Sequence, residues 1–206
     1  MKFADWEPLY REIRDDFGYS EEEDTKAAEF LVDVRGSDGL RPLRALKGEV
    51  IEICGPYFSE VKGGVKIAAG ASLEQMLEKG VEPDLMVTDL DGDTALQSEM
   101  NSKGIPAVMH AHGDNIDLIN GWAKRFEGHV ISTCQCKPPK KGIYNFGGFT
   151  DGDRAAFIAD HFDAEEIILS GWDLEKPYDK REIKKKKLQW AKRLLKRIEI
   201  PISPRL

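Results

Sequence analysis

Residues 84–93, DLMVTDLDGD, decide the fold class of the chain. The first half, DLMVT, is a short apolar run of the kind that forms a buried strand. The second half places acidic residues directly after that strand, together with a glycine that allows a sharp turn. A buried strand that ends in a polar turn is typical of parallel α/β sheets, where ligands bind beyond the carboxyl ends of the strands.

Five further β-rich runs repeat this form along the chain. They are residues 50–54, 66–69, 107–110, 130–133 and 167–170. Helical segments lie between them, and strands that alternate with helices predict a doubly wound, mostly parallel sheet. We therefore expect an α/β fold, a Rossmann-like three-layer sandwich.

The chain begins with a segment that reads as helical. Apolar residues recur at three- and four-residue steps from Trp6 to Phe17, and Gly18 follows as a stop. Ser20 with Glu23 then forms a capping-box pattern that opens a second helix. We predict an N-terminal helical segment over 1–45, which caps an α/β catalytic domain over 46–206.

Composition and charge exclude several classes of protein. The 206 residues carry a net charge of -7, which argues against a nucleic-acid binder that neutralises phosphates. No apolar run reaches the roughly 18 residues of a membrane span, and Met1–Trp6 lacks a signal pattern. The three cysteines, Cys54, Cys134 and Cys136, are sparse and odd in number. They predict reduced thiols and a cytoplasmic protein, and the C-x-C pair lacks the usual spacing of a zinc site.

The tail over 176–196 contains four consecutive lysines and then apolar residues at helical spacing. This pattern predicts an amphipathic helix with a basic face. A run of like charges on a helix is more often a hydrated face than a nucleic-acid patch, so we assign the lysines to solvent.

The acidic cluster after residue 88 predicts a metal site. Asp89 and Asp91 are two residues apart, so their side chains share one side of an extended segment, and Asp93 adds a third acid. Magnesium prefers oxygen ligands and commonly bridges carboxylates to substrate phosphates. We expect a magnesium-dependent enzyme that handles a nucleoside triphosphate; a merely hydrated charged loop is the alternative.

A second polar cluster, HAHGDN at residues 110–115, also follows an apolar run. Asp114 is a candidate to complete the metal shell. His110 or His112 could contact phosphate or act as a base. The alternative is a polar turn in which the aspartate only caps a helix.

The third cluster is NFGGFTDGDR at residues 145–154. Gly147 and Gly148 permit close approach of the backbone to a ligand. Thr150 or Asp151 can cap a following helix, whose exposed N–H groups suit a phosphate, and Arg154 offers forked donors.

The three clusters, in this order, resemble the archaeal 6-hydroxymethyl-7,8-dihydropterin pyrophosphokinases, a family similar to the thiamin pyrophosphokinases. The likeness extends to Asp5-Trp6 and to Phe17–Ser20 near the start of the chain. The stretches 110–115 and 145–154 carry it most specifically.

The resemblance implies transfer of a diphosphate group from ATP to the hydroxymethyl group of the pterin, with release of AMP. It implies Mg²⁺ held by Asp89, Asp91 and Asp114, which with His112 form the catalytic set. ATP and a small pterin alcohol are the expected partners, and a homo-oligomer is compatible with the family. The residues implied to contact nucleotide or pterin are His110, Asn115, Gly147, Gly148, Thr150, Asp151, Asp153 and Arg154.

Two stretches depart from the family pattern. Where the family usually has Ala-Ala-Asp-Gly-Ala, this chain has Ala68-Ala69-Gly70-Ala71, without the acid. Where the family usually has Gly-Pro-Ser, it has Gly55-Pro56-Tyr57. Both stretches lie in loops that we expect to face the site.

Three other functions compete with this interpretation. The DLDG sequence at 89–92 also occurs in haloacid-dehalogenase-type phosphatases, where the first aspartate is a nucleophile. The missing acid is compatible with a non-catalytic nucleotide- or pterin-binding module. A pyrophosphokinase that acts on another alcohol, such as thiamin, is the third.

Overall fold

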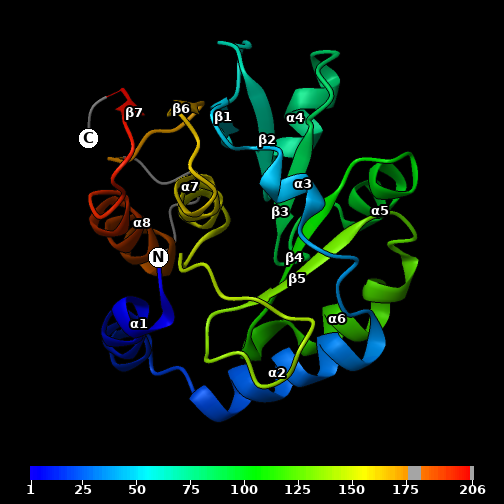
Figure 1. The fold of residues 1–206 in the computed structure, drawn as a ribbon, viewed down its shortest axis with the longest axis vertical. Helices are drawn as coiled ribbons and strands as arrows, with labels where there is room; N and C mark the ends of the chain where they lie inside the picture. Colours follow the sequence, from blue (N-terminus) through cyan, green and yellow to red (C-terminus); the bar gives the residue numbers. More distant parts are fainter. Residues whose placement is uncertain (176–181, 205–206) are drawn as a thin grey trace. The chain divides into compact units, whose positions relative to one another are not determined.

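The computed structural model describes residues 1–175 and 182–204, and its strands belong to one sheet (Figure 1). The strand order is β5-β4-β3-β2-β1-β6-β7. Every strand pair with a defined register is parallel. The strands are β1 (Val50–Cys54), β2 (Val65–Ala69), β3 (Leu85–Thr88), β4 (Ala107–Ala111), β5 (Val130–Cys134), β6 (Glu166–Ser170) and β7 (Ile202–Ser203).

Helices connect most of these strands, and three precede the first one. The α-helices are α1 (Phe3–Phe17), α2 (Glu21–Val34), α3 (Arg41–Arg44), α4 (Ser72–Glu78), α5 (Thr94–Ser102), α6 (Ile116–Trp122), α7 (Asp151–His161) and α8 (Glu182–Leu195). Two short 3₁₀ helices are η1 (Gly113–Asn115) and η2 (Ala123–Arg125). The predicted α/β class, with a parallel sheet after an N-terminal helical segment, is confirmed.

The six predicted strands are all present, with bounds that differ from the prediction by no more than one residue. The strand β7 was not predicted. It has two residues and pairs with β6 through Ile167 opposite Ile202, so its apolar pattern is too short to be recognised.

By their contacts, the residues divide into two compact units, each assembled from separate stretches of chain. The first unit combines Met1–Leu40 with Thr88–Gly147, and the second combines Arg41–Val87 with Gly148–Leu206. The predicted division into 1–45 and 46–206 follows the order of the chain and stays a prediction.

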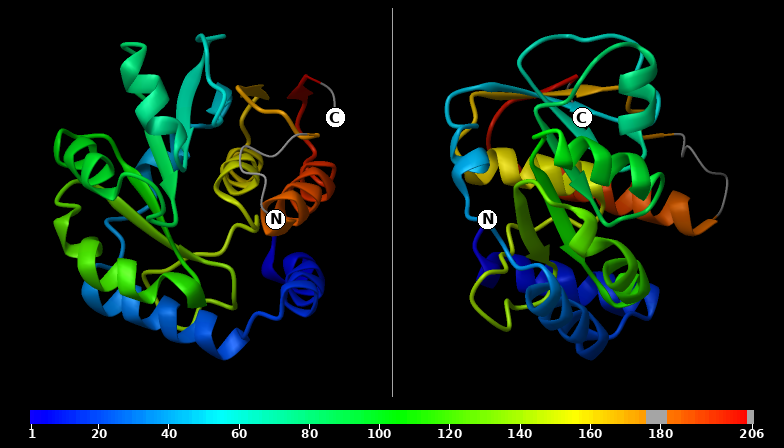
Figure 2. Two further views of the ribbon diagram at one scale, coloured as in Figure 1. Left: turned by 180° about the vertical axis from the view of Figure 1, so that it is seen from behind. Right: turned by 90° about the vertical axis from the view of Figure 1, so that its right-hand side faces the viewer.

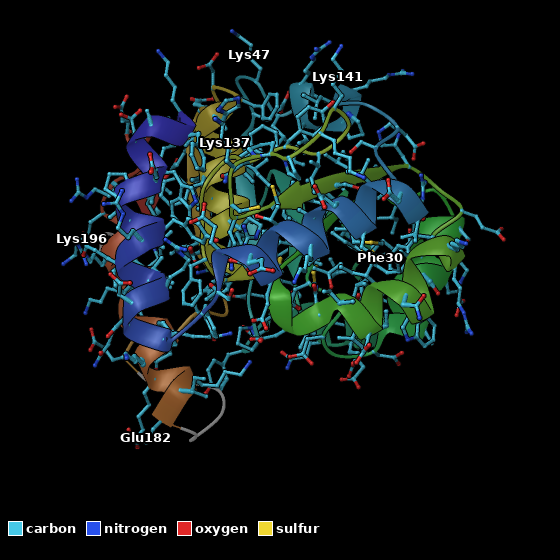
Figure 3. All side chains as sticks on the ribbon, turned by 90° about the horizontal axis from the view of Figure 1, so that it is seen from below. Phe30, Lys47, Lys137, Lys141, Glu182 and Lys196 are labelled. Atoms are coloured by element: carbon cyan, nitrogen blue, oxygen red, sulfur yellow. The ribbon has the colours of Figure 1, made fainter. Side chains whose placement is uncertain are left out.

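The first unit is organised around α2 and the parallel pair β4–β5. The helix α2 contacts both strands and runs alongside α6, as seen around the labelled Phe30 in Figure 3. Its buried face carries Ala27, Ala28 and Leu31, with Asp24 one turn earlier. From α1, the indole N–H of Trp6 donates to the carbonyl oxygen of Gln135 at 2.8 Å.

In the second unit α7 is the central helix. It contacts β1, β2 and α8, and the two helices α7 and α8 lie side by side in Figure 2. Residues 152–159 are all buried, as expected for a helix that is covered on several sides.

The end of α1 and the start of α2 follow the predicted capping chemistry. Gly18 adopts a left-handed conformation with φ 72°, and its N–H donates to the carbonyl of Arg14 at 2.7 Å. The hydroxyl of Ser20 accepts from the N–H of Glu23 at 3.4 Å. The chain therefore enters α2 where the sequence predicts.

A helix was predicted over 176–196, and α8 is present within this range. Residues 176–181 of the predicted range lie outside the described residues. Its buried side is formed by Trp190, Ala191, Leu194 and Leu195. No helix in the described part of the chain is long and apolar enough to cross a membrane.

All three cysteines are buried and none is in a disulfide, as predicted. Burial raises the pKa of the Cys54 thiol to about 12, and the neighbouring Glu52 carboxylate acts in the same direction. This thiol is therefore protonated and unreactive near neutral pH.

We predict that Leu31→Ala lowers the free energy of unfolding by about 2–5 kcal/mol, because Leu31 is fully buried and its truncation leaves a cavity. Urea denaturation followed by circular dichroism measures the change. The control is Glu29→Ala, an exposed position on the same helix, for which a change within about 0.5 kcal/mol is expected. Equal losses in the two variants would contradict this assignment of the core.

Candidate active site

The turn after β3 is not extended, so the predicted geometry of its acids is wrong. The strand ends at Thr88, and Leu90 adopts a left-handed conformation with φ 70°. A leucine in this region costs about 1–2 kcal/mol. Leu90 is nevertheless only 1% exposed, and its buried side chain anchors the turn.

Hydrogen bonds from Thr88 and Thr94 hold Leu90 in this conformation. The N–H of Leu90 donates to Thr88 Oγ1 at 2.8 Å, and the hydroxyl of Thr94 donates to the carbonyl of Leu90 at 2.7 Å. Thr88 Oγ1 in turn donates to Gln97 Oε1 at 2.8 Å. The start of α5 thus fixes the turn that carries the acids.

The three acids of this turn have different environments. Asp89 is half-buried, and its Oδ1 accepts from the N–H of Asp91 at 3.1 Å. Asp91 is exposed, and its Oδ1 accepts from the N–H of Gly92 at 2.9 Å. Asp93 caps α5, since its Oδ1 accepts from the N–H of Leu96 at 2.9 Å. The third acid of the cluster therefore has a structural partner.

Asn115 joins this turn to the one after β4. Its buried amide group donates to the carbonyl of Asp89 at 2.7 Å and to the carbonyl of His110 at 2.8 Å. Its Oδ1 accepts from the N–H of His112 at 3.0 Å. One side chain therefore sets the distance between the two polar clusters, within the first unit.

His112 lies between the acids of the two turns. Its Nδ1 accepts from the N–H of Asp114 at 3.3 Å, so the ring proton of the neutral imidazole is on Nε2. Nε2 lies 3.6 Å from Asp89 Oδ2. His112 therefore directs an N–H group toward the Asp89 carboxylate.

His110 is buried inside the sheet. Its Nδ1 lies 3.1 Å from the hydroxyl oxygen of Thr133 on β5, and that hydroxyl donates to the carbonyl of Met109 at 3.3 Å. The hydrogen bond between His110 and Thr133 therefore links the side chains of β4 and β5. A contact of His110 with substrate stays a prediction.

Sequence analysis missed Asp24 and Tyr19, two residues of the N-terminal segment. Together with His112 and Asp114 they line a small cavity of about 10 Å³, room for one water molecule. Burial raises the pKa of the Tyr19 hydroxyl, and the carboxylates of Asp114 and Asp24 raise it further. A signal for Asp24 was available, because this acid stands on the otherwise apolar stripe of α2 formed with Ala28 and Leu31.

The loop before α7 in the second unit is held by its own side chains. Thr150 is the N-cap of α7, as predicted, and forms a reciprocal capping box with Asp153. The Asp153 carboxylate accepts from the N–H of Phe149 at 2.6 Å and of Thr150 at 2.9 Å. Burial raises the pKa of this carboxyl, and the hydrogen bonds that it accepts oppose the shift. Arg154 also turns inward and donates to the carbonyl of Phe149 at 3.1 Å.

Close packing requires a glycine at position 148 of this loop. Gly148 has φ 89°, and a Cβ there would lie 2.4 Å from the Arg154 Cα. The N–H of Gly147 donates to Asn145 Oδ1 at 2.8 Å. The glycine pair therefore serves the shape of the loop, and its predicted contact with a ligand stays a prediction.

The two departures from the family pattern lie at strand ends of the second unit. At the end of β2, a Cβ on Gly70 would lie 2.8 Å from Asp151 Oδ2, so the Asp151 carboxylate lies beside the stretch that lacks its acid. At the end of β1, the Trp172 indole packs on Gly55 and donates to the carbonyl of Ile53 at 2.9 Å. The same indole contacts Gly152 of α7.

The structure thus brings the predicted residues together in two sets. Asp89, Asp91, His110, His112, Asp114 and Asn115 lie in the first unit, around the ends of β3 and β4. Gly148, Thr150, Asp151, Asp153 and Arg154 lie in the second unit, while Gly147 closes the first. Over residues 1–175 and 182–204, no group of three or more His, Cys, Asp or Glu side chains is arranged to hold a metal ion. The metal roles of the acids stay predictions.

The fold and these turns define a parallel α/β protein with oxygen-rich ligand groups at the carboxyl ends of its strands. Residues 59–179 match the family described as 6-hydroxymethylpterin diphosphokinase MptE-like. The chain belongs to this family.

Relatives from three archaea match almost the full length, and each is named 6-hydroxymethyl-7,8-dihydropterin pyrophosphokinase. The Pyrococcus furiosus protein is 39% identical over 95% of this chain and 93% of its own length. The Methanocaldococcus jannaschii protein is 34% identical over 95% of both chains. The Methanothermobacter thermautotrophicus protein is 31% identical over 97% of this chain and 96% of its own. The predicted family is therefore confirmed.

We predict that Asn115→Ala lowers the free energy of unfolding by about 2–4 kcal/mol, because two carbonyls lose their buried donor. Asn115→Asp preserves the shape but replaces the donors with an oxygen, and is expected to be at least as destabilising at neutral pH. Chemical denaturation measures both variants. Asn120→Ala, at an exposed position on α6, is the control and should change stability by less than about 0.5 kcal/mol. Wild-type stability of Asn115→Asp would exclude the assigned donor role.

Proposed function

We propose that this protein transfers a diphosphate group from ATP to the hydroxymethyl group of 6-hydroxymethyl-7,8-dihydropterin and releases AMP. The observation that carries the proposal is the double hydrogen bond of Asn115, which holds the Asp89 turn against the turn that bears His112 and Asp114. The names of the three archaeal relatives give the chemical identity of the substrate.

Asp89, Asp91 and Asp114 are the residues that would hold magnesium. Carboxylate oxygens are the hard ligands that this ion prefers, and it commonly retains waters and substrate phosphates as further ligands. A closed cage of protein side chains is therefore unnecessary in this proposal. When bound, magnesium neutralises charge on the triphosphate.

The acids and His112 have distinct tasks in this proposal. Asp91 is exposed and presents its carboxylate toward solvent, where a nucleotide can reach it. Asp89 is half-buried, and its Oδ2 lies 3.6 Å from His112 Nε2, so the imidazole lies beside this carboxylate without a direct hydrogen bond. Because these carboxylates serve as ligands, neither needs to become phosphorylated.

The reaction itself requires mainly positioning. The hydroxymethyl oxygen of the pterin forms a bond to the β-phosphorus of ATP, and the bond from that phosphorus to the oxygen of the α-phosphate breaks. The hydroxyl proton passes to water as the new bond forms. Most of the rate then comes from alignment of the two substrates and from stabilisation of charge.

The loop over 148–154 contributes its backbone and Asp151 to substrate binding in this proposal. Asp153 and Arg154 use their polar atoms to shape the loop, so they act on substrate through its conformation. In this proposal the N–H groups at the start of α7 and the Asp151 carboxylate contact nucleotide or pterin. We place the reaction in the cytoplasm, where ATP and reduced pterins are available.

The test incubates the purified protein with ATP, Mg²⁺ and either the dihydropterin alcohol or thiamin. AMP that appears only with the pterin supports the proposal. AMP that appears with thiamin assigns the protein to the other alcohol, and tight pterin binding without AMP assigns it to a binding module. A phosphoaspartate trapped at Asp89 would instead support a phosphatase.

We expect Asp89→Asn and Asp91→Asn each to lower kcat by at least about 100-fold, because each removes charge that would offset the triphosphate. The fold should persist, since both side chains lie in a surface turn. Asp93→Asn is the matched control: it removes a charge from the same turn, yet asparagine also caps helices, so turnover should stay within a few-fold of wild type. Full activity of both Asp89→Asn and Asp91→Asn would refute the metal assignment.

A further inference from the structure

A buried carboxylate that the proposed mechanism does not use lies beside the turn after β4. Asp24 belongs to α2 and is only 2% exposed. Its Oδ2 accepts from the hydroxyl of Tyr10 at 2.6 Å and from Gln135 Nε2 at 2.9 Å. Its Oδ1 accepts from the backbone N–H of Gly113 at 2.8 Å. Three donors from α1, from η1 and from the residue after β5 therefore converge on one carboxylate.

The contact with Gly113 is close as well as polar. A Cβ on Gly113 would lie 2.8 Å from the Cβ of Glu23, so the backbone of this turn packs directly on the first turns of α2. The position of Gly113 is thus set both by van der Waals contact and by the hydrogen bond to Asp24.

Gly113 stands between the two functional candidates of its turn. His112 precedes it, and the Nε2 of His112 faces Asp89. Asp114 follows it, and the N–H of Asp114 donates to His112 Nδ1. A shift of Gly113 therefore moves one magnesium-ligand candidate, Asp114, and the imidazole that faces another, Asp89.

We propose that Asp24 is a positioning residue of the active site, which holds the 112–114 turn in its working conformation through the N–H of Gly113. This inference rests on the proposed function. Groups that orient metal ligands typically change metal affinity or activity by about 10–100-fold when removed. An effect of that size is expected here.

Two variants of Asp24 separate position from charge. Asp24→Ala removes the acceptor of the Gly113 N–H, so kcat should fall, or the Mg²⁺ concentration for half-maximal rate should rise, by about 10–100-fold. Asp24→Asn can retain an oxygen opposite Gly113, while its amide group faces the Tyr10 hydroxyl oxygen and a rotated Gln135 amide. The turnover of Asp24→Asn should therefore stay within a few-fold of wild type.

The matched control is Asp38→Ala. Asp38 is also an acid of the N-terminal segment that accepts a backbone N–H from the β-strands, that of Val130 at 2.9 Å. Val130 begins β5, whereas the candidate site lies around the carboxyl ends of the strands. This variant should lose stability without a change in the kcat of the folded protein.

A readout without substrate or metal is the backbone amide resonance of Gly113 in ¹H–¹⁵N NMR spectra. In Asp24→Ala this resonance should shift and its hydrogen should exchange faster with solvent, and in Asp38→Ala it should not. If wild-type protein forms no AMP, the proposed function fails while the Gly113 amide still tests the link to Asp24.

Three results would overturn the role of Asp24. They are wild-type kinetics of folded Asp24→Ala, an equal loss of kcat in Asp38→Ala, and an unchanged Gly113 amide in Asp24→Ala. If Asp24→Ala does not fold, Asp24→Asn decides: a loss of about 100-fold with an unmoved Gly113 amide would show that charge, and not position, is what Asp24 provides.

Discussion

The candidate site depends on the carboxamide of Asn115. Two polar turns that follow different strands come into register because one buried amide group donates to a carbonyl in each, those of Asp89 and His110. The amide is suited to this task, since it has two donors on one planar group and an acceptor left for the N–H of His112. The contact between His112 Nε2 and Asp89 Oδ2 is a weaker constraint, because its 3.6 Å separation is beyond hydrogen-bond range.

Most of the fold was predictable, because its determinants are local. Buried parallel strands are mostly apolar runs, and each of the six longer strands is largely apolar, although Glu52 interrupts β1. Helix ends follow from Gly18 and Ser20, whose conformational and capping preferences depend on few neighbours. The short strand β7 was not predicted, because its two residues form a strand only through pairing with β6, which is a tertiary effect.

The location of the candidate residues at strand ends was predictable, and their geometry was less so. The acids were recognised because they cluster directly after strands. The resemblance to the family then suggested their roles. The conformation of Leu90 was missed because a left-handed leucine is intrinsically unfavourable and exists here through burial and contacts with Thr88 and Thr94. Asp153 illustrates the opposite problem: an acid in a glycine-rich loop has the same pattern whether it faces a ligand or, as here, its own backbone.

The first compact unit is discontinuous, and this affects how the chain folds during synthesis. The indole of Trp6 meets its hydrogen-bond partner 129 residues later, at Gln135. At ribosomal rates of about 5–20 residues per second, α1 and α2 wait on the order of ten seconds for the strands that bury them. Isolated helices of this length are marginal in water, so their apolar faces are transiently open to other chains. The helices α1 and α2 are thus synthesised well before the partners that bury them.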